Sequence, residues 1–463
     1  MLTNSTNSVL SQIRYQYQIP LHRAEAGCTK RFLQSLLPTC LSWSGIALLL
    51  FVPYHLALRL VTDSRIVFAW KEVAEGIGTI AFVVLSQRFR PSWRLLSLYL
   101  IVLTCSLAFA FDFDDPQLSL EGYFLIFGFI SVGYLFYRIG QSWSQGRNTP
   151  LIALVVGISL IAAFWLYFEG RLGLSYLFKQ EQEGNFYLAR EGINRARFTF
   201  DSPMDAGQWM WLCSTLSLAF FFLSRRAVQM ALFFGVFILD AIAILFTGSR
   251  GPYLLLAGSI PLLLIAMCRL SLPKKKTKLI VLGAVLLLLV VGLAIYRPLD
   301  EEANAFSNIF GSVSDLAEQD NVLRLDLMRE GVARLADVPL VGEGMNRLSN
   351  KNPLTAIDYE NTYLGLAVAT GLPGIVMGLT FFSLIALVTL RSSVVLLKRR
   401  GTFLDVVFVA LAPVWLAYSF VFPHFQGRIA SLINWIVIGL ALAALEQRRL
   451  RIQPSSKVKV LDR

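Results

Sequence analysis

The sequence predicts an all-α, polytopic membrane protein with about twelve transmembrane helices and a large outward loop, and three observations support this fold class. Of the 463 residues, 56% are hydrophobic and 16% are charged, whereas a soluble domain carries about 25% charged residues. The apolar residues form separate runs, many of which reach the roughly 20 residues needed to cross a bilayer. The basic residues fall in alternate connecting loops, which is the pattern that membrane orientation produces.

Twelve apolar runs are candidate transmembrane spans. They cover residues 41–60, 66–86, 95–113, 121–138, 149–168, 206–223, 227–247, 251–268, 279–296, 372–390, 403–423 and 428–446. Residues 1–38 are polar and basic, so we expect no cleavable signal peptide.

Basic residues gather in the loops after every second span. These loops include Arg88, Arg90 and Arg94, then Arg225 and Arg226, then Lys274, Lys275 and Lys276, and finally Arg448, Arg449 and Arg451. All lie on the side of the basic N-terminus, so the positive-inside bias predicts that both termini are cytoplasmic. The same placement explains the net charge of +12 without a nucleic-acid partner.

This topology divides the chain into seven segments. They are a cytoplasmic basic N-terminal segment at 1–40, spans one to five at 41–168, an outward loop at 169–205, spans six to nine at 206–296, a large outward loop at 297–371, spans ten to twelve at 372–446, and a cytoplasmic basic tail at 447–463. Within the large loop, residues 321–336 are predicted to form an amphipathic helix that Pro339, Gly342 and Gly344 end.

Arginine side chains on the outward side could bind phosphate oxygens, because guanidinium presents a planar fork of donors. Arg250 lies between Gly248 and Gly251, which permit a tight turn, and the alternative for Arg250 is an interfacial anchor. Arg324 lies on the predicted loop helix. Two later arginines of this helix, at positions 329 and 334, point elsewhere by helical spacing and are interpreted as ordinary solvated residues.

Arg195 and Arg197 precede the sixth span on the outward side. Either could hold a phosphate group. The alternative is a loop ion pair with Glu191 or Asp201, and the pattern alone favours this alternative.

Glu360 and Asn361 lie where the large loop returns to the membrane. A carboxylate at a partly dry interface can accept a proton from a hydroxyl group. The alternative is an N-cap or first-turn acid for a helix that starts near Asn361, and both roles can hold together. His424 also emerges on the outward side and is a reserve candidate for the base.

The five cysteines and three histidines show no metal-ligand spacing, so we expect neither a metal site nor a cofactor. Lys71 and Glu75 stand four residues apart on the second span, where they suit an ion pair or the lining of a cavity. Asp240 in the seventh span is costly without a partner.

Several of these motifs resemble those of the O-antigen ligase/O-antigen polymerase family. Arg250 and Leu254 are similar to its Arg-x3-Leu motif, and Asn361 with Gly371 and Gly374 is similar to its His-Asn-x9-Gly-x2-Gly signature. Arg324 followed by residues 339–344 resembles its Arg-led loop helix and Pro-Leu-x-Gly-x-Gly turn. Arg197 with residues 202–204 resembles its Arg before an Asn-Pro-Asn-like turn. Ligases of the family carry histidine where this chain has Glu360, which favours the polymerase branch.

The resemblance implies a GT-C-like glycosyltransferase of the bacterial inner membrane, with its active site in the periplasmic loops. The donor would be an oligosaccharide on undecaprenyl pyrophosphate, and the transfer would be inverting and independent of a metal. Arg250 and Arg324 would stabilise the leaving pyrophosphate, and Glu360 would activate the acceptor hydroxyl. The substrate-binding candidates are Arg195, Arg197, Asn361 and His424.

Three functions fit this pattern. The favoured one is a polymerase that joins lipid-linked repeat units; the nearest rival is an O-antigen ligase that transfers glycan to lipid A–core or to a protein. A glycolipid or polysaccharide transporter also fits the predicted spans, although the two large outward loops argue against it. Expected partners are the lipid-linked donor, a glycan or lipid A–core acceptor, membrane lipid, a chain-length regulator and a flippase.

Overall fold

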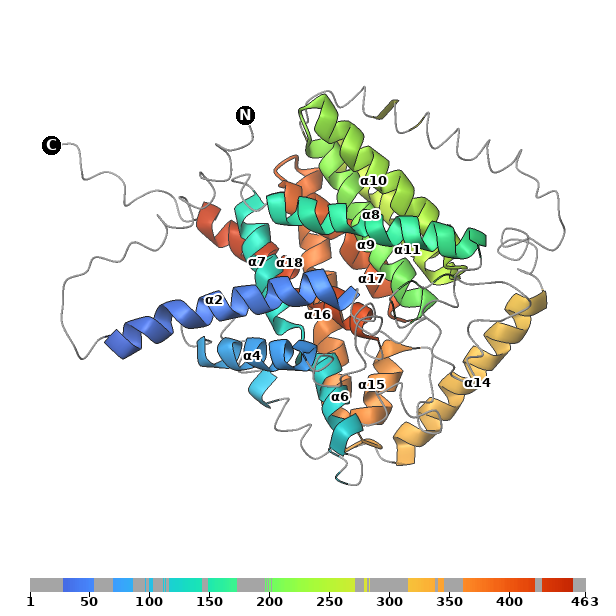
Figure 1. Cartoon of the computed structure of the whole chain (residues 1–463). Helices are drawn as coiled ribbons and strands as arrows, with labels where there is room; N and C mark the ends of the chain where they lie inside the picture. Colours follow the sequence, from blue (N-terminus) through green and yellow to red (C-terminus); the bar gives the residue numbers. More distant parts are fainter. Residues whose placement is uncertain are drawn as a thin grey trace.

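In the residues that it describes, the computed structural model has helices joined by turns and no strands. The described residues are 28–53, 70–85, 96, 100–102, 111, 113, 116–143, 149–172, 196, 198, 200, 202–270, 279–280, 283, 315–337, 340–344, 361–420 and 427–452. The helices are α2 (Cys28–Phe51), α4 (Trp70–Leu85), α6 (Pro116–Phe127), α7 (Ile130–Ser142), α8 (Thr149–Leu172), α9 (Pro203–Leu223), α10 (Ala227–Phe246), α11 (Arg250–Cys268), α14 (Asp315–Asp337), α15 (Thr362–Thr370), α16 (Leu372–Leu397), α17 (Phe403–Tyr418) and α18 (Arg428–Ile452). Figure 1 shows their arrangement.

Seven segments within the described ranges are long and apolar enough to cross a membrane. They are Leu118–Gln141, Ile152–Glu169, Pro203–Leu223, Ala227–Phe246, Gly251–Cys268, Leu372–Leu397 and Arg428–Glu446. Shorter apolar helices occupy Thr39–Phe51 and Phe403–Tyr418. The expected all-α membrane fold is therefore confirmed, while the count of about twelve spans stays a prediction. The predicted spans at 95–113 and 279–296 lie mostly outside the described residues.

The centre of the bundle is formed by α9 and α18. Burial reaches 94% along the apolar window of α9 and 89% along that of α18, against 33% for α10 and for α16. A helix that is apolar all round belongs inside a bundle, whereas a helix with one buried side faces lipid with the other. This difference places α9 and α18 at the core and α10 and α16 at the periphery.

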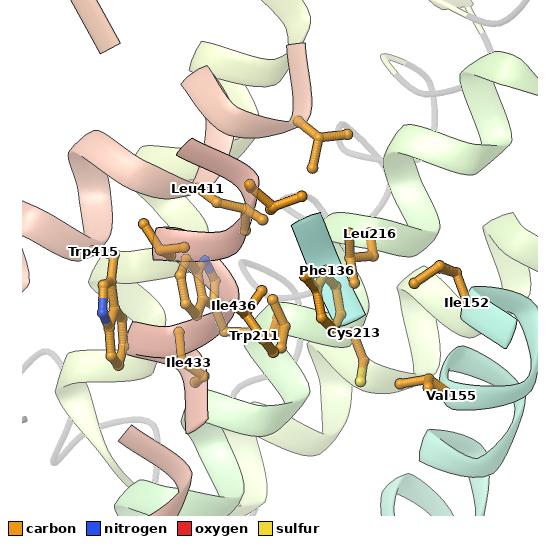
Figure 2. Close-up of a cluster of buried hydrophobic side chains, with 14 of the residues drawn as sticks. Phe136, Ile152, Val155, Trp211, Cys213, Leu216, Leu411, Trp415, Ile433 and Ile436 are labelled. Carbon is orange, nitrogen blue, oxygen red and sulfur yellow. The ribbon is translucent and has the colours of Figure 1, made fainter. Parts of the chain in front are cut away.

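Two stacked tryptophan rings connect helices in the core of the bundle (Figure 2). The rings of Trp211 on α9 and Trp415 on α17 lie 5.4 Å apart and nearly parallel. Trp211 Nε1 donates to Ser259 Oγ on α11 at 2.9 Å, and Trp415 Nε1 donates to Asn434 Oδ1 on α18 at 2.8 Å. The indole N–H groups of Trp211 and Trp415 therefore both have acceptors. The stacked pair and its two hydrogen bonds connect α9, α11, α17 and α18.

The predicted span at 121–138 is interrupted in the structure. Helix α6 ends at Phe127 and α7 begins at Ile130, and the Glu75 carboxylate packs against Gly128 between them. A Cβ atom at Gly128 would lie 2.7 Å from Glu75 Oε2. Trp435 Nε1 donates to the Ile126 carbonyl at 2.8 Å. Hydrophobic periodicity cannot reveal this break, because it depends on side chains from α4 and α18.

Helix α14 confirms the amphipathic helix expected over 321–336 and extends it to Asp315–Asp337. In Figure 1 it is the amber helix at the edge of the bundle, next to α15. Its charged sequence distinguishes it from the candidate spans. Helix α14 is thus an accessory element that reaches the bundle through α15.

Candidate functional site

The motif that starts at Asn361 and the motif around Arg250 both contact the last turn of α17. Thr362 N, at the start of α15, donates to the Ser419 carbonyl at 3.0 Å. Asn361 Nδ2 donates to the Phe420 carbonyl at 3.0 Å, and Ser419 Oγ lies 2.8 Å from the Tyr363 hydroxyl oxygen. These three bonds fix the N-terminus of α15 against the C-terminal end of α17.

Helix α11 begins against the same turn of α17. Gly251 packs so closely on the Tyr418 ring that a Cβ atom there would fall on the Tyr418 hydroxyl. Gly248 has a φ of 58°, in the left-handed region that glycine adopts without strain. Pro252 packs in turn on Gly207 of α9. The glycines around Arg250 therefore bring the α11 N-terminus against α9 and α17, and α15 starts beside it.

Arg250 itself is the first residue of α11. The structure describes its backbone and not the position of its side chain. The N-terminus of a helix carries unpaired N–H groups and a partial positive charge, which favour an anion near them. Both α11 and α15 direct this end toward the last turn of α17.

The segment before α9 also reaches this region. Ala196 N donates to the Phe246 carbonyl at the end of α10 at 3.0 Å, and Phe198 N donates to Glu169 Oε2 on α8 at 2.7 Å. These two residues flank Arg197, which lies outside the described residues, as does Arg195. The backbone on both sides of Arg197 is therefore held near the turn that leads to Arg250.

Asn361 is the N-cap of α15. Its Oδ1 accepts from the backbone N–H groups of Tyr363 and Leu364, both at 3.0 Å. With the bond to Phe420, three of the four hydrogen-bonding positions of the amide are used within the protein. Glu360 immediately precedes this cap, so the alternative reading of Glu360 as the N-cap is wrong. Burial raises the pKa of the Tyr363 hydroxyl.

A turn of the large loop covers the opposite end of α15. Glu343 N donates to the Val368 carbonyl at 2.8 Å, and Gly344 N donates to the Ala369 carbonyl at 2.9 Å. Gly342 and Gly371 have φ values of 77° and 65°, and a Cβ atom on either would lie within about 2.7 Å of the other segment's backbone. The turn at residues 340–344 and the end of α15 thus cross so closely that only glycine fits at positions 342 and 371.

Arg334 connects α14 to this turn. Its Nη2 lies 2.6 Å from Glu330 Oε1, and its Nη1 lies 3.4 Å from Glu343 Oε1. Its side chain is 30% exposed, so its interpretation as an ordinary solvated residue is wrong. The i, i+4 spacing to Glu330 is visible in the sequence, but the partner at 343 is not. Arg329, by contrast, is 78% exposed and pairs only locally with Asp326, as the sequence indicated.

A second charged cluster lies at the start of α18. Arg428 Nη2 lies 3.0 Å from Glu121 Oε1 and 3.6 Å from Glu72 Oε1, and Lys71 Nζ lies 3.8 Å from Glu72 Oε1. Lys71 therefore has Glu72 as a partner, and the pairing of Lys71 with Glu75 stays a prediction. The role of Arg428 was not predictable from the sequence, because its partners lie on α4 and α6.

The structure describes some of the predicted site residues and not others. Arg250 and Arg324 are described as helix backbone, and Asn361 is described in full. Glu360, His424, Arg195 and Arg197 lie outside the described residues. The proximity of the Arg250 and Arg324 side chains stays a prediction. In the described part of the chain, no group of three or more His, Cys, Asp or Glu residues could hold a metal ion.

These features define a multi-pass, all-helical membrane protein in which helix ends from α9, α11, α15, α17 and α18 gather at one face. Residues 235–379 match the family described as O-antigen ligase. The match confirms the resemblance to the O-antigen ligase/polymerase family over the segment from α10 to the first turns of α16. The matched family indicates a membrane glycosyltransferase-like enzyme. A comparison with curated proteins gave no match.

Proposed function

We propose that this protein is an inner-membrane polysaccharide polymerase, which joins undecaprenyl-pyrophosphate-linked repeat units at the periplasmic face. The observation that carries the proposal is the meeting of α11 and α15 at the last turn of α17. It brings the backbone of Arg250 and the backbone next to Glu360 to one place, although the two motifs are more than 100 residues apart in the sequence.

The reaction needs an acid–base group on one side of the anomeric carbon and anion stabilisation on the other. The acceptor hydroxyl oxygen forms a bond to the anomeric carbon, and its proton passes to the Glu360 carboxylate. The bond from the anomeric carbon to the pyrophosphate oxygen breaks, and the electron pair leaves with the pyrophosphate. Attack opposite to the leaving group inverts the configuration.

Guanidinium groups would stabilise the charge that develops on the pyrophosphate. Arg250 is proposed for this role together with Arg324, and Arg197 and Arg195 would hold the phosphates of the bound donor. The N-termini of α11 and α15 add the partial positive charge of helix ends. This transfer requires no divalent ion in its charge balance.

The test is bond formation by purified protein with lipid-linked oligosaccharide in detergent. Arg250→Ala and Arg324→Ala should abolish turnover while expression and membrane insertion are retained, and wild-type activity in either would refute the assigned role. Glu360→Gln should lower the rate by roughly 10²-fold or more if it is the base. A near-silent Glu360→Gln variant would move this role to His424. Arg329→Ala, on the exposed side of α14, is the matched control.

The second candidate is an O-antigen ligase, which the description of the matched family favours. A ligase would use the same groups with a lipid A–core or protein acceptor. Gene deletion separates the two, because short single-repeat products indicate a polymerase. Loss of every attached length, with accumulation of lipid-linked polymer, indicates a ligase.

A further inference from the structure

One side of α16 is exposed along the helix, and most of its residues are apolar. The exposed residues recur every three or four positions, as one face of a helix does. The exposed apolar residues are Leu372, Val376, Leu379, Leu387, Leu390, Val394 and Leu397, each at least 40% exposed, and Ser383 fills the position between Leu379 and Leu387. The opposite face is buried against the protein. Because α16 is a candidate membrane span, this stripe is its lipid-facing surface.

The turn at 340–344 extends this stripe beyond the start of α16. Leu340 is 70% exposed and Val341 is 45% exposed. The Leu340 backbone lies against Gly371: a Cβ atom on Gly371 would be within 2.7 Å of the Leu340 carbonyl group. Gly371 directly precedes Leu372, the first residue of α16. The two apolar side chains therefore continue the stripe at the end of α16 where the large loop joins it.

The backbone of the turn is fixed, so the exposed side chains of Leu340 and Val341 stay on the surface. Its backbone is bonded to the carbonyls of Val368 and Ala369, and Gly342 fits closely against α15. The Glu343 side chain points away toward Arg334 on α14. An apolar pair presented by a fixed backbone, and contiguous with a lipid-facing helix, is a surface of the kind that enters the acyl boundary of a bilayer.

We propose that Leu340 and Val341 insert into the outer leaflet of the membrane and anchor the large loop there. The occupant of this surface is bilayer lipid, because the surface is continuous with the lipid-facing stripe of α16. The anchored turn sets the C-terminal end of α14 at the level of the lipid headgroups. If the proposed function holds, this is also the level of a lipid-linked pyrophosphate.

The experiment is spin-label accessibility in lipid nanodiscs, with the five native cysteines replaced by alanine. A nitroxide on Leu340→Cys should be relaxed strongly by oxygen and weakly by a water-soluble nickel chelate. Leu387→Cys, in the middle of the α16 stripe, is the lipid control. Ala333→Cys, on the exposed side of α14, is the control outside the proposed surface. We expect the label at 340 to give at least a threefold higher oxygen-to-nickel ratio than the label at 333.

Two results would overturn the proposal. Strong nickel relaxation at 340 would place the turn in water, and weak relaxation by both reagents would place it against protein, in a second copy or a partner. Hydroxyl-radical footprinting of the unmodified chain in nanodiscs gives a second measurement. The peptide with Leu340 and Val341 should be as protected as the peptide with Leu387, and oxidation at the rate of a 70% exposed leucine would contradict insertion. Neither experiment needs turnover, so the result is independent of the proposed reaction.

Discussion

Removing the Arg334 side chain should loosen the turn at 340–344 from α15. Arg334 has two carboxylate partners, Glu330 and Glu343, and the exposed fractions of Arg334 and Glu343 are 30% and 17%. Exposed ion pairs contribute about 0.2–1 kcal/mol. Because this pair is partly buried, we expect a coupling energy near the upper limit, about 1 kcal/mol. Opening of the turn would then become roughly fivefold more frequent.

Hydrogen exchange measures this opening directly. The amides of Glu343 and Gly344 are bonded to carbonyls of α15, so their exchange reports separation of the two segments. Mass spectrometry of Arg334→Ala in detergent should show roughly fivefold faster exchange of the peptide at 340–344. Glu343→Ala removes the same ion pair between α14 and the turn and should have a similar effect, because the remaining pair of Arg334 with Glu330 lies within α14.

The control for this experiment is Arg329→Ala, because Arg329 forms an exposed pair on the same helix. Its effect on the turn should be below about twofold. Equal effects of the two arginine variants, or unchanged exchange in Arg334→Ala, would show that the ion pair does not hold the turn. The backbone bonds and the glycine crossing alone would then account for the docking.

Three further predictions concern the helix ends at the site. Asn361→Ala removes the N-cap and the bond to Phe420 and should cost about 0.5–2 kcal/mol, whereas Asn361→Asp keeps the capping oxygen and should lower the melting temperature in detergent less. Gly371→Ala combines a φ of 65° with backbone contact at 2.6 Å and should reduce the yield of folded protein severely, whereas Gly235→Ala, with open space around it, should be neutral or stabilising by up to about 1 kcal/mol. Turnover should survive a metal chelator, and restoration of lost activity by Mg²⁺ would contradict the charge balance proposed for the arginines.

The sequence predicted helix ends best, because caps, glycines and prolines set these ends locally. Residues 339–344 predicted the end of the loop helix, which α14 reaches at Asp337. The pattern around Arg250 predicted a helix start, and α11 begins there. The start near Asn361 was also correct, because an asparagine cap acts on its own next turn. Caps, glycines and prolines act within a few residues, so a single sequence contains their signals.

Contacts between distant segments were not predictable in this way. Nothing in the spacing of Gly342 or Gly371 indicates that their backbones touch. The partner of Arg334 at 343 and the partners of Arg428 on two other helices depend on how the elements pack. Hydrophobic periodicity defines which face of a helix is buried and leaves open which element covers it. The site was therefore foreseen as separate motifs, and their meeting at α17 came from the structure.

The spacing of the motif from Asn361 to Gly374 follows from the length of one helix. Asn361 caps α15, the nine residues Thr362–Thr370 form it, and Gly371 ends it with a positive φ. Gly374 then packs against the Leu366 carbonyl, where a Cβ atom would not fit. Capping and close packing thus explain Asn361, Gly371 and Gly374 without any contact to a substrate. We therefore propose that the chemistry depends on the residue before the cap, Glu360, and on Arg250 across the α17 turn. A one-residue insertion within α15 should accordingly disrupt docking of the 340–344 turn, and Glu360→Gln should leave that docking intact while it lowers turnover.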